Sequence, residues 1–68
     1  MKKYYVNKTA QSNGDHEVHN ENCLFLPNIE NRKYLGMFSS CEEAVKEAKK
    51  EYSRSNGCYH CSNACHTK

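Results

Sequence analysis

Cys58-Tyr59-His60-Cys61, near the end of this 68-residue chain, is the stretch that decides how the rest folds. Two cysteines separated by two residues can hold one metal ion from a single tight turn. A second pair of donors, His19 and Cys23, lies in the first third of the chain. Small domains build a tetrahedral site by folding the intervening segment so that two such half-sites meet. The sequence therefore predicts one metal site with four ligands, which are His19, Cys23, Cys58 and Cys61.

The composition explains why the fold needs such a site. A chain of 68 residues is one domain, residues 1–68, and only 37% of it is hydrophobic, with no Trp and two Phe. Domains of this size bury too little apolar surface to be stable alone and usually add a metal or disulfides. The five cysteines are therefore a structural requirement, as ligands or as bridges.

The expected cellular compartment favours a role for the cysteines as metal ligands over a role as disulfide bridges. No apolar stretch has the length of a membrane span, and the apolar core of a signal peptide is missing after Lys2 and Lys3. We therefore expect a cytoplasmic protein, in which thiols stay reduced. An odd number of cysteines also leaves one unpaired if the others form bridges.

Several other donors compete for the site. If a helical turn follows Cys61, Cys65 comes to lie on the same side and completes an all-sulfur site, and His66 is a further competitor for the fourth position. His16 is expected on the hairpin surface and His60 in solvent. In a strictly alternating strand, the side chains of Val18 and His19 point to opposite faces. His19 is therefore expected to leave the strand at the turn to reach the metal.

The remaining pattern predicts a small α+β fold. Strand formers at Tyr4–Asn7 and His16–His19 flank the turn Ser12–Asp15, whose Asn-Gly centre is typical of a hairpin. A third strand is expected at Arg32–Phe38, broken near its glycine. A capped helix is expected at Ser40–Tyr52, with one apolar face that includes Cys41 as a small core residue. The fold class is thus a three-stranded antiparallel sheet, one main helix and a C-terminal cysteine knuckle.

Two details concern the half-sites themselves. The apolar run Cys23–Leu26, closed by Pro27, is expected to form one helical turn or an extended piece that plugs the core. Gly57 is expected to supply the positive φ that a metal knuckle often requires directly before its first cysteine.

Zinc is the cofactor that this ligand set favours, as one ion. An iron–sulfur cluster on Cys23, Cys58, Cys61 and Cys65 is the competing hypothesis. The spacing that covalent haem attachment uses is not met. Because the candidate ligands outnumber the coordination positions of zinc, a closed structural site is favoured over a catalytic one, which keeps a position open.

The order of these motifs resembles the small zinc-binding domain of Ada-type DNA repair regulators and stand-alone Ada-like metal-binding modules. The resemblance spans residues 4 to 61, and the matching residues are His19, Cys23, Asn31-Arg32-Lys33-Tyr34, Phe38-Ser39-Ser40, Glu43-Ala44 and Cys58-Tyr59-His60-Cys61. It implies one zinc held by His19, Cys23, Cys58 and Cys61, with nucleic acid as a partner. In the DNA-repair members the first ligand is a cysteine that accepts a methyl group, and His19 stands at that position here.

The resulting functional hypothesis is a non-catalytic zinc-binding module. Catalytic signatures such as paired carboxylates, a Gly-rich phosphate loop or a Ser-His-Asp order are missing from the sequence. The net charge of +2 leaves a protein partner nearly as well supported as nucleic acid, with Tyr4, Tyr5 and Tyr59 as contacts, and no membrane or small-molecule partner is expected. Two alternatives stay open: a zinc-activated thiol protein (methyl acceptor or redox sensor) and a disulfide-stapled domain without metal.

Overall fold

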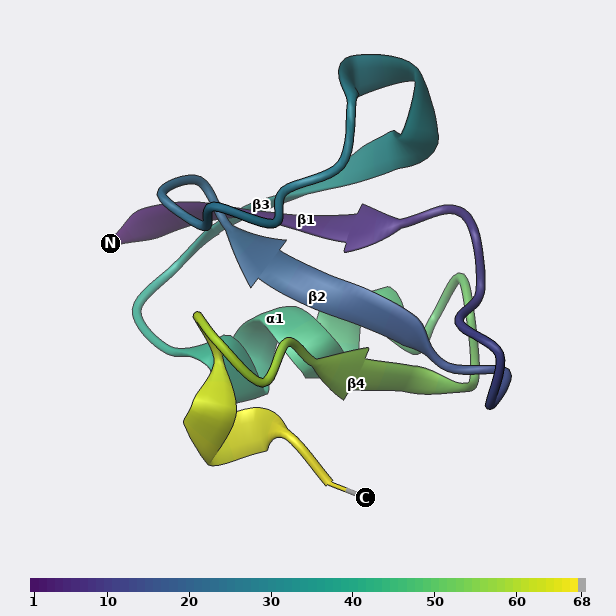
Figure 1. Ribbon diagram of the computed structural model, residues 1–68. Helices are drawn as coiled ribbons and strands as arrows, with labels where there is room; N and C mark the ends of the chain where they lie inside the picture. The colour runs from purple at the N-terminus through teal and green to yellow at the C-terminus, as the bar shows by residue number, and fades with distance from the viewer. Residues whose placement is uncertain (68) are drawn as a thin grey trace.

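The computed structural model describes residues 1–67, in which one helix packs on one face of a four-stranded sheet (Figure 1). The strands occur in the order β3-β1-β2-β4 across the sheet. The elements are β1 Lys2–Asn7, β2 His16–Asn20, the 3₁₀ turn η1 Ile29–Asn31, β3 Arg32–Phe38, α1 Cys41–Ala48, β4 Ser55–Gly57 and the 3₁₀ turn η2 Asn63–Cys65.

The three strands that the sequence predicts form the antiparallel part of the sheet. β1 pairs with β2, and Tyr4 lies opposite Asn20. β1 also pairs with β3, and the register shifts between Tyr4 and Tyr5 where Gly36 adopts φ +129°. Gly14 in the hairpin turn adopts φ +93°, a conformation that side chains other than glycine rarely tolerate. The hairpin therefore follows the prediction. β3 is not broken near Gly36 as expected: it continues from Arg32 to Phe38, and the irregularity is a shift in its pairing with β1.

The prediction of a purely antiparallel, three-stranded sheet is wrong, because a fourth strand runs parallel to β2. Ser55–Gly57 pairs with His16–Val18 as β4. These three residues lack β-branched or aromatic side chains, so propensity gives them no strand signal. Backbone pairing with β2 makes them a strand, and this pairing carries the chain directly toward Cys58, whose N–H donates to the Val18 carbonyl at 2.9 Å.

The helix begins where its cap predicts and ends earlier than expected. The Ser40 hydroxyl accepts the N–H of Glu43 at 3.4 Å, and α1 begins at the next residue. The helix ends at Ala48, and a looser turn follows in which the Tyr52 N–H donates to the Ala48 carbonyl at 2.8 Å. The predicted apolar face is confirmed. It packs on the sheet, and the buried core consists of Tyr4, Val6, Val18, Ala44 and Ala48.

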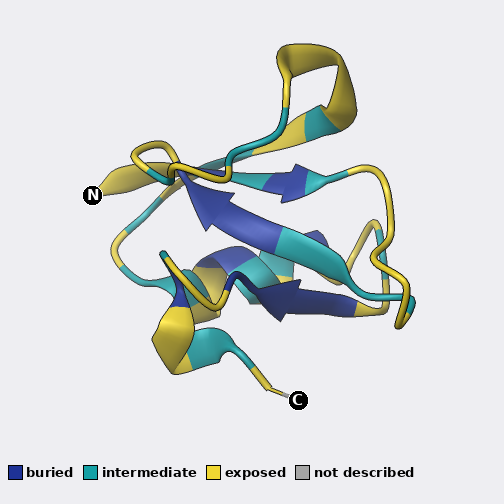
Figure 2. Cartoon of the chain, viewed as in Figure 1, coloured by how far each residue is buried: buried dark blue, intermediate teal, exposed yellow. Residues whose placement is uncertain are grey.

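Two predicted surface roles change. Tyr4 belongs to this core and is 7% exposed, so the expectation that it contacts a partner is wrong. The run that begins at Cys23 does not plug the core. Leu24 is 95% exposed and Phe25 57% exposed, on a loop that Figure 2 shows as largely open to solvent.

A disulfide joins Cys41, the first residue of α1, to Cys65, the last residue of η2. The expectation that all five cysteines are reduced is therefore wrong for this pair, and Cys41 is more than a small core residue. Closing a loop of this length stabilises a fold by about 3.5 kcal/mol in the chain-entropy model. The other three cysteines, Cys23, Cys58 and Cys61, are free thiols.

Candidate metal centre

Four side chains from the two predicted half-sites meet at the end of β2. The donor atoms of His19, Cys23, Cys58 and Cys61 all lie within 4.8 Å of one another. The His19 Nδ1 lies 3.4 Å from the Cys23 Sγ and 4.0 Å from the Cys61 Sγ. The Cys23 and Cys58 sulfur atoms are 3.9 Å apart, well beyond a disulfide bond. The structure thus brings together the set that the sequence singles out, at distances that suit one metal ion.

His19 reaches this cluster without leaving its strand, contrary to the expectation from alternation. It remains in β2 and is only 1% exposed, and its neighbour Val18, on the opposite face, is also buried. Val18 packs in the core with α1, and His19 is covered by the cysteines of the cluster. The Asn20 N–H donates to the Cys61 Sγ at 3.4 Å, and the Asn20 side-chain amide donates to the Cys61 carbonyl at 3.3 Å.

Cys23 is positioned by a tight turn directly after β2. The Asn20 side-chain oxygen accepts the N–H of Asn22 at 2.9 Å, and the Asn20 carbonyl accepts the N–H of Cys23 at 3.2 Å. The Phe25 N–H then donates to the Cys23 Sγ at 3.4 Å. An N–H donor aimed at a sulfur atom stabilises a thiolate, which is the form that binds a metal.

The C-terminal half-site begins where β4 ends. The Ser62 N–H donates to the Cys58 carbonyl at 2.9 Å and closes the turn that holds both cysteines. Gly57 does not have the positive φ that we expected. Glycine is needed there because of close packing: a Cβ at position 57 would lie 2.7 Å from both the Cys65 Cβ and the Ser62 carbonyl oxygen.

Burial shapes the protonation of the cluster. It lowers the pKa of the His19 imidazole, against a smaller opposing effect of the Glu17 carboxylate, so His19 is neutral at neutral pH. Burial raises the pKa of Cys23 to about 12, and the neighbouring Cys61 thiol adds to this rise. Burial also raises the pKa of Cys58, although the N–H groups of His60 and Cys61 oppose the rise. Without a metal these two thiols are protonated at neutral pH.

The second imidazole nitrogen of His19 carries a further signal. Its Nε2 is buried and has no hydrogen-bond partner within residues 1–67, yet it lies 3.5 Å from the Glu17 carboxylate. Metal-ligating histidines usually donate their other N–H to a carboxylate. Glu17 lies two residues before His19 and shares its face of β2. The sequence pattern predicts no carboxylate partner for His19; the signal for Glu17 is its position two residues before His19 in a strand.

The competing donors lie elsewhere. η2 is the short helical turn on which the all-sulfur hypothesis depended, but Cys65 is bonded to Cys41. The His66 Nδ1 is 3.0 Å from the Gly57 carbonyl oxygen. His16 stacks on Tyr52 with ring centroids 4.0 Å apart, and the exposed His60 stacks on Phe25 at 4.3 Å. The alternatives that used Cys65 or His66 as ligands therefore fail in this structure.

No protein-family model matches the chain, and the curated proteins and solved structures compared with it include no match. Over residues 1–67, no helix is long and apolar enough to cross a membrane.

Proposed function

We propose that the protein is a non-catalytic module whose fold is organised by one zinc ion held by His19, Cys23, Cys58 and Cys61. One observation carries the proposal. A tetrahedral zinc ion with Zn–S bonds of about 2.3 Å and a Zn–N bond of about 2.0 Å places sulfur pairs about 3.8 Å apart and nitrogen–sulfur pairs about 3.5 Å apart. The 3.9 Å between the Cys23 and Cys58 sulfur atoms and the 3.4 Å between the His19 Nδ1 and the Cys23 Sγ fit these values, and the 4.0 Å between the His19 Nδ1 and the Cys61 Sγ is about 0.5 Å longer.

The same distances favour one ion over an iron–sulfur cluster. In an iron–sulfur cluster the four cysteines bind two or four different iron atoms, so they cannot all lie as close together as four ligands of one metal. Here all four donor atoms lie within 4.8 Å of one another. The fourth sulfur that the cluster hypothesis used, that of Cys65, is in a disulfide. Three sulfurs and one imidazole are a common ligand set of structural zinc sites. When bound, zinc would supply a Lewis-acidic centre that all four protein ligands close off.

Cobalt substitution tests this ligand set directly. Co²⁺ occupies tetrahedral zinc sites, and its visible absorption reports the geometry and the presence of thiolate ligands. We expect one equivalent of Co²⁺ to give tetrahedral d–d bands and a thiolate-to-cobalt charge-transfer band, both of which one equivalent of zinc abolishes. An octahedral spectrum, or no spectral change, would reject the proposed site.

Replacing Glu17 with Gln is expected to weaken zinc binding about tenfold while leaving one zinc per chain. The loss of a carboxylate behind a ligating histidine typically costs about 10- to 100-fold in metal affinity. The measurement is competition for zinc against a chromophoric chelator. Glu21→Gln is the matched control, since it removes the same charge two residues before Cys23, and within residues 1–67 the Glu21 carboxylate accepts only the Lys3 N–H, at 3.4 Å. Equal losses in both variants would mean that Glu17 acts through general charge alone.

Zinc uptake at neutral pH is expected to release protons, including those of Cys23 and Cys58. Their raised pKa values keep both thiols protonated in the metal-free state, and zinc binds the thiolates. The apparent zinc affinity therefore rises with pH, by about 100-fold per unit if two protons leave. Titration calorimetry in buffers of different ionisation enthalpy gives the number released. A count of zero would exclude thiolate coordination by these two residues.

The partner surface that we propose lies on the two half-site turns. Leu24, Phe25 and Tyr59 are more than half exposed, and Phe25 and His60 stack across the two turns. This apolar character and the modest net charge of +2 support a protein partner over nucleic acid. The Ada-like resemblance supports nucleic acid instead. Fluorescence anisotropy with a single-stranded oligonucleotide at physiological salt distinguishes the protein-partner hypothesis from the nucleic-acid hypothesis. We expect no binding, and binding would support nucleic acid as the partner.

A zinc-activated thiol is the second candidate function, and one observation favours it. Cys23 and Cys61 are half-buried and line a hollow of about 250 Å³. A small electrophile in this hollow would meet sulfur atoms that zinc keeps as thiolates. Alkylation of the zinc-bound protein followed by peptide mapping decides: rapid modification of one of these cysteines supports the thiol function, and slow, unselective modification supports the closed module.

A further inference from the structure

We propose that the Cys41–Cys65 disulfide is a redox-sensitive clamp on the metal centre, so that opening it weakens zinc binding. The proposal rests on the zinc site described above and adds its regulation. Three of the five cysteines lie in the metal cluster, and the other two, Cys41 and Cys65, form a bridge. Cys65 is only four residues beyond the ligand Cys61.

A short chain of backbone hydrogen bonds connects the bridge to the ligands. The Ser62 N–H donates to the Cys58 carbonyl, and the Cys65 N–H donates to the Ser62 carbonyl, each at 2.9 Å. Ser62 is itself 3% exposed. The ligating turn and η2 therefore form one hydrogen-bonded unit, so a displacement of Cys65 is transmitted to Cys58 and Cys61.

Cys65 also packs against the residue that precedes the first ligand of this turn. Space for a Cβ at Gly57 is occupied by the Cys65 Cβ and backbone. The other half of the bridge, Cys41, is the first residue of α1, which packs on the sheet that carries His19. The disulfide thus fixes the C-terminal half-site to the element that supports the N-terminal one.

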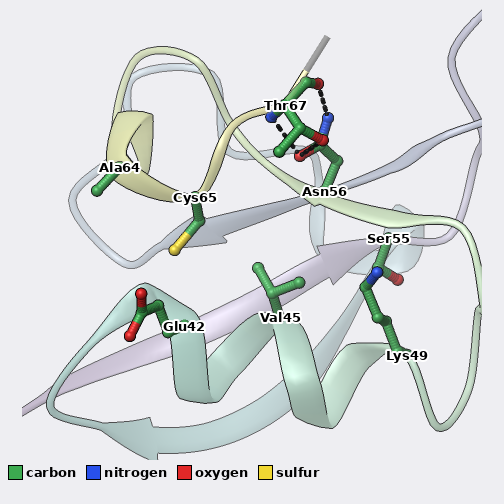
Figure 3. A pocket seen from close by; sticks show the side chains of 8 residues that line it. All are labelled: Glu42, Val45, Lys49, Ser55, Asn56, Ala64, Cys65 and Thr67. Carbon is green, nitrogen blue, oxygen red and sulfur yellow. Dashed lines mark hydrogen bonds between the residues drawn. The ribbon is translucent and has the colours of Figure 1, made fainter.

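The bridge is open to small reductants. Cys41 and Cys65 are both half-buried, and Cys65 lines a hollow of about 260 Å³ between α1 and the C-terminal segment. Figure 3 shows its sulfur pointing from η2 toward the helix, near Glu42 and Val45. Two monothiol molecules can reduce it: the Cys41–Cys65 bond breaks, each sulfur gains one electron and one proton, and the two monothiols join in a disulfide.

Opening the bridge weakens zinc binding through the ligating turn. The Cys58–Cys61 turn loses its covalent link to α1, so its ligating geometry is less preorganised. Coupling of this kind is reciprocal, so bound zinc must make the bridge harder to reduce by the same factor that the bridge strengthens zinc binding.

The test compares zinc affinity in three forms of the full chain under anaerobic conditions, by competition with a chromophoric chelator. They are the bridged protein, the glutathione-reduced protein after removal of glutathione, and the double variant Cys41→Ser/Cys65→Ser. We expect about tenfold weaker binding in both unbridged forms, within the about 5- to 150-fold range of coupled sites. The reciprocal measurement is the equilibrium ratio of bridged to reduced protein in a glutathione redox buffer, which saturating zinc should raise by the same factor.

Equal zinc affinity in the bridged and glutathione-reduced proteins would overturn the clamp, and this comparison does not depend on the folding of the double variant. A bridge that is reduced equally with and without zinc would overturn it as well. If none of the forms binds zinc, it is the zinc site itself that fails, together with the clamp that depends on it. If zinc binds tightly and with the same affinity whether or not the bridge is present, the zinc site stands and the disulfide is only a structural crosslink.

Discussion

Removal of zinc with a chelator is expected to unfold most of the chain. The buried core contains five residues, two of which are alanines, so it provides little hydrophobic stabilisation. Structural zinc in small domains contributes an apparent binding free energy of about 10–16 kcal/mol at pH 7. The disulfide contributes only about 3.5 kcal/mol and joins residues in the second half of the chain. The proposed zinc would therefore be the dominant stabilising interaction.

The measurement is the dispersion of amide resonances before and after adding an excess of chelator to the bridged protein. We expect dispersion to collapse, and to return when zinc is added in excess of the chelator. The control is the same chelator saturated with zinc beforehand, which should leave the spectrum unchanged. A dispersed spectrum that survives chelation would show that the small core and the disulfide are sufficient for the fold.

Replacing Cys58 with Ser is expected to abolish tight zinc binding. Cys58 is 1% exposed, follows β4 directly and contributes a sulfur 3.9 Å from that of Cys23. A serine hydroxyl is a poor zinc ligand at neutral pH, because it does not ionise as a thiol does. The loss should exceed about 100-fold, since even the partner of a ligand is worth about 10- to 100-fold. The same chelator competition measures it.

The control replaces a cysteine outside the cluster with serine. Cys65→Ser opens the bridge to Cys41 but leaves all four cluster residues in place, and it should keep one zinc with only the moderate loss that the clamp predicts. Comparable losses in the two variants would show that folding as a whole, rather than coordination by Cys58, determines zinc binding.

Much of the fold follows from local chemistry. The bounds of β3, the N-cap at Ser40 and the apolar face of α1 could be predicted, because each depends on neighbouring side chains. The convergence of His19, Cys23, Cys58 and Cys61 could be predicted for a similar reason. Each half-site is local, and a core too small to be stable alone favours a fold in which the half-sites meet.

The features that could not be predicted depend on tertiary contacts. β4 is a strand only because β2 offers an edge to Ser55–Gly57, which carry no strand signal of their own. The pairing of Cys41 with Cys65 requires α1 and η2 to lie together, and no spacing in the sequence specifies that. His19 was expected to leave its strand because the prediction assumed that only one face of the strand is covered. At the end of β2 both faces are covered, so Val18 and His19 are both buried within the strand.

Native mass spectrometry of freshly purified protein, beside its denatured, non-reduced mass, is the direct test of the zinc centre. We expect one zinc ion per chain in the native spectrum. In the denatured spectrum we expect a mass two hydrogens below that of the fully reduced chain, for one disulfide and three free thiols. A protein without metal, with two of the cysteines at positions 23, 58 and 61 joined in a second disulfide, would contradict both expectations.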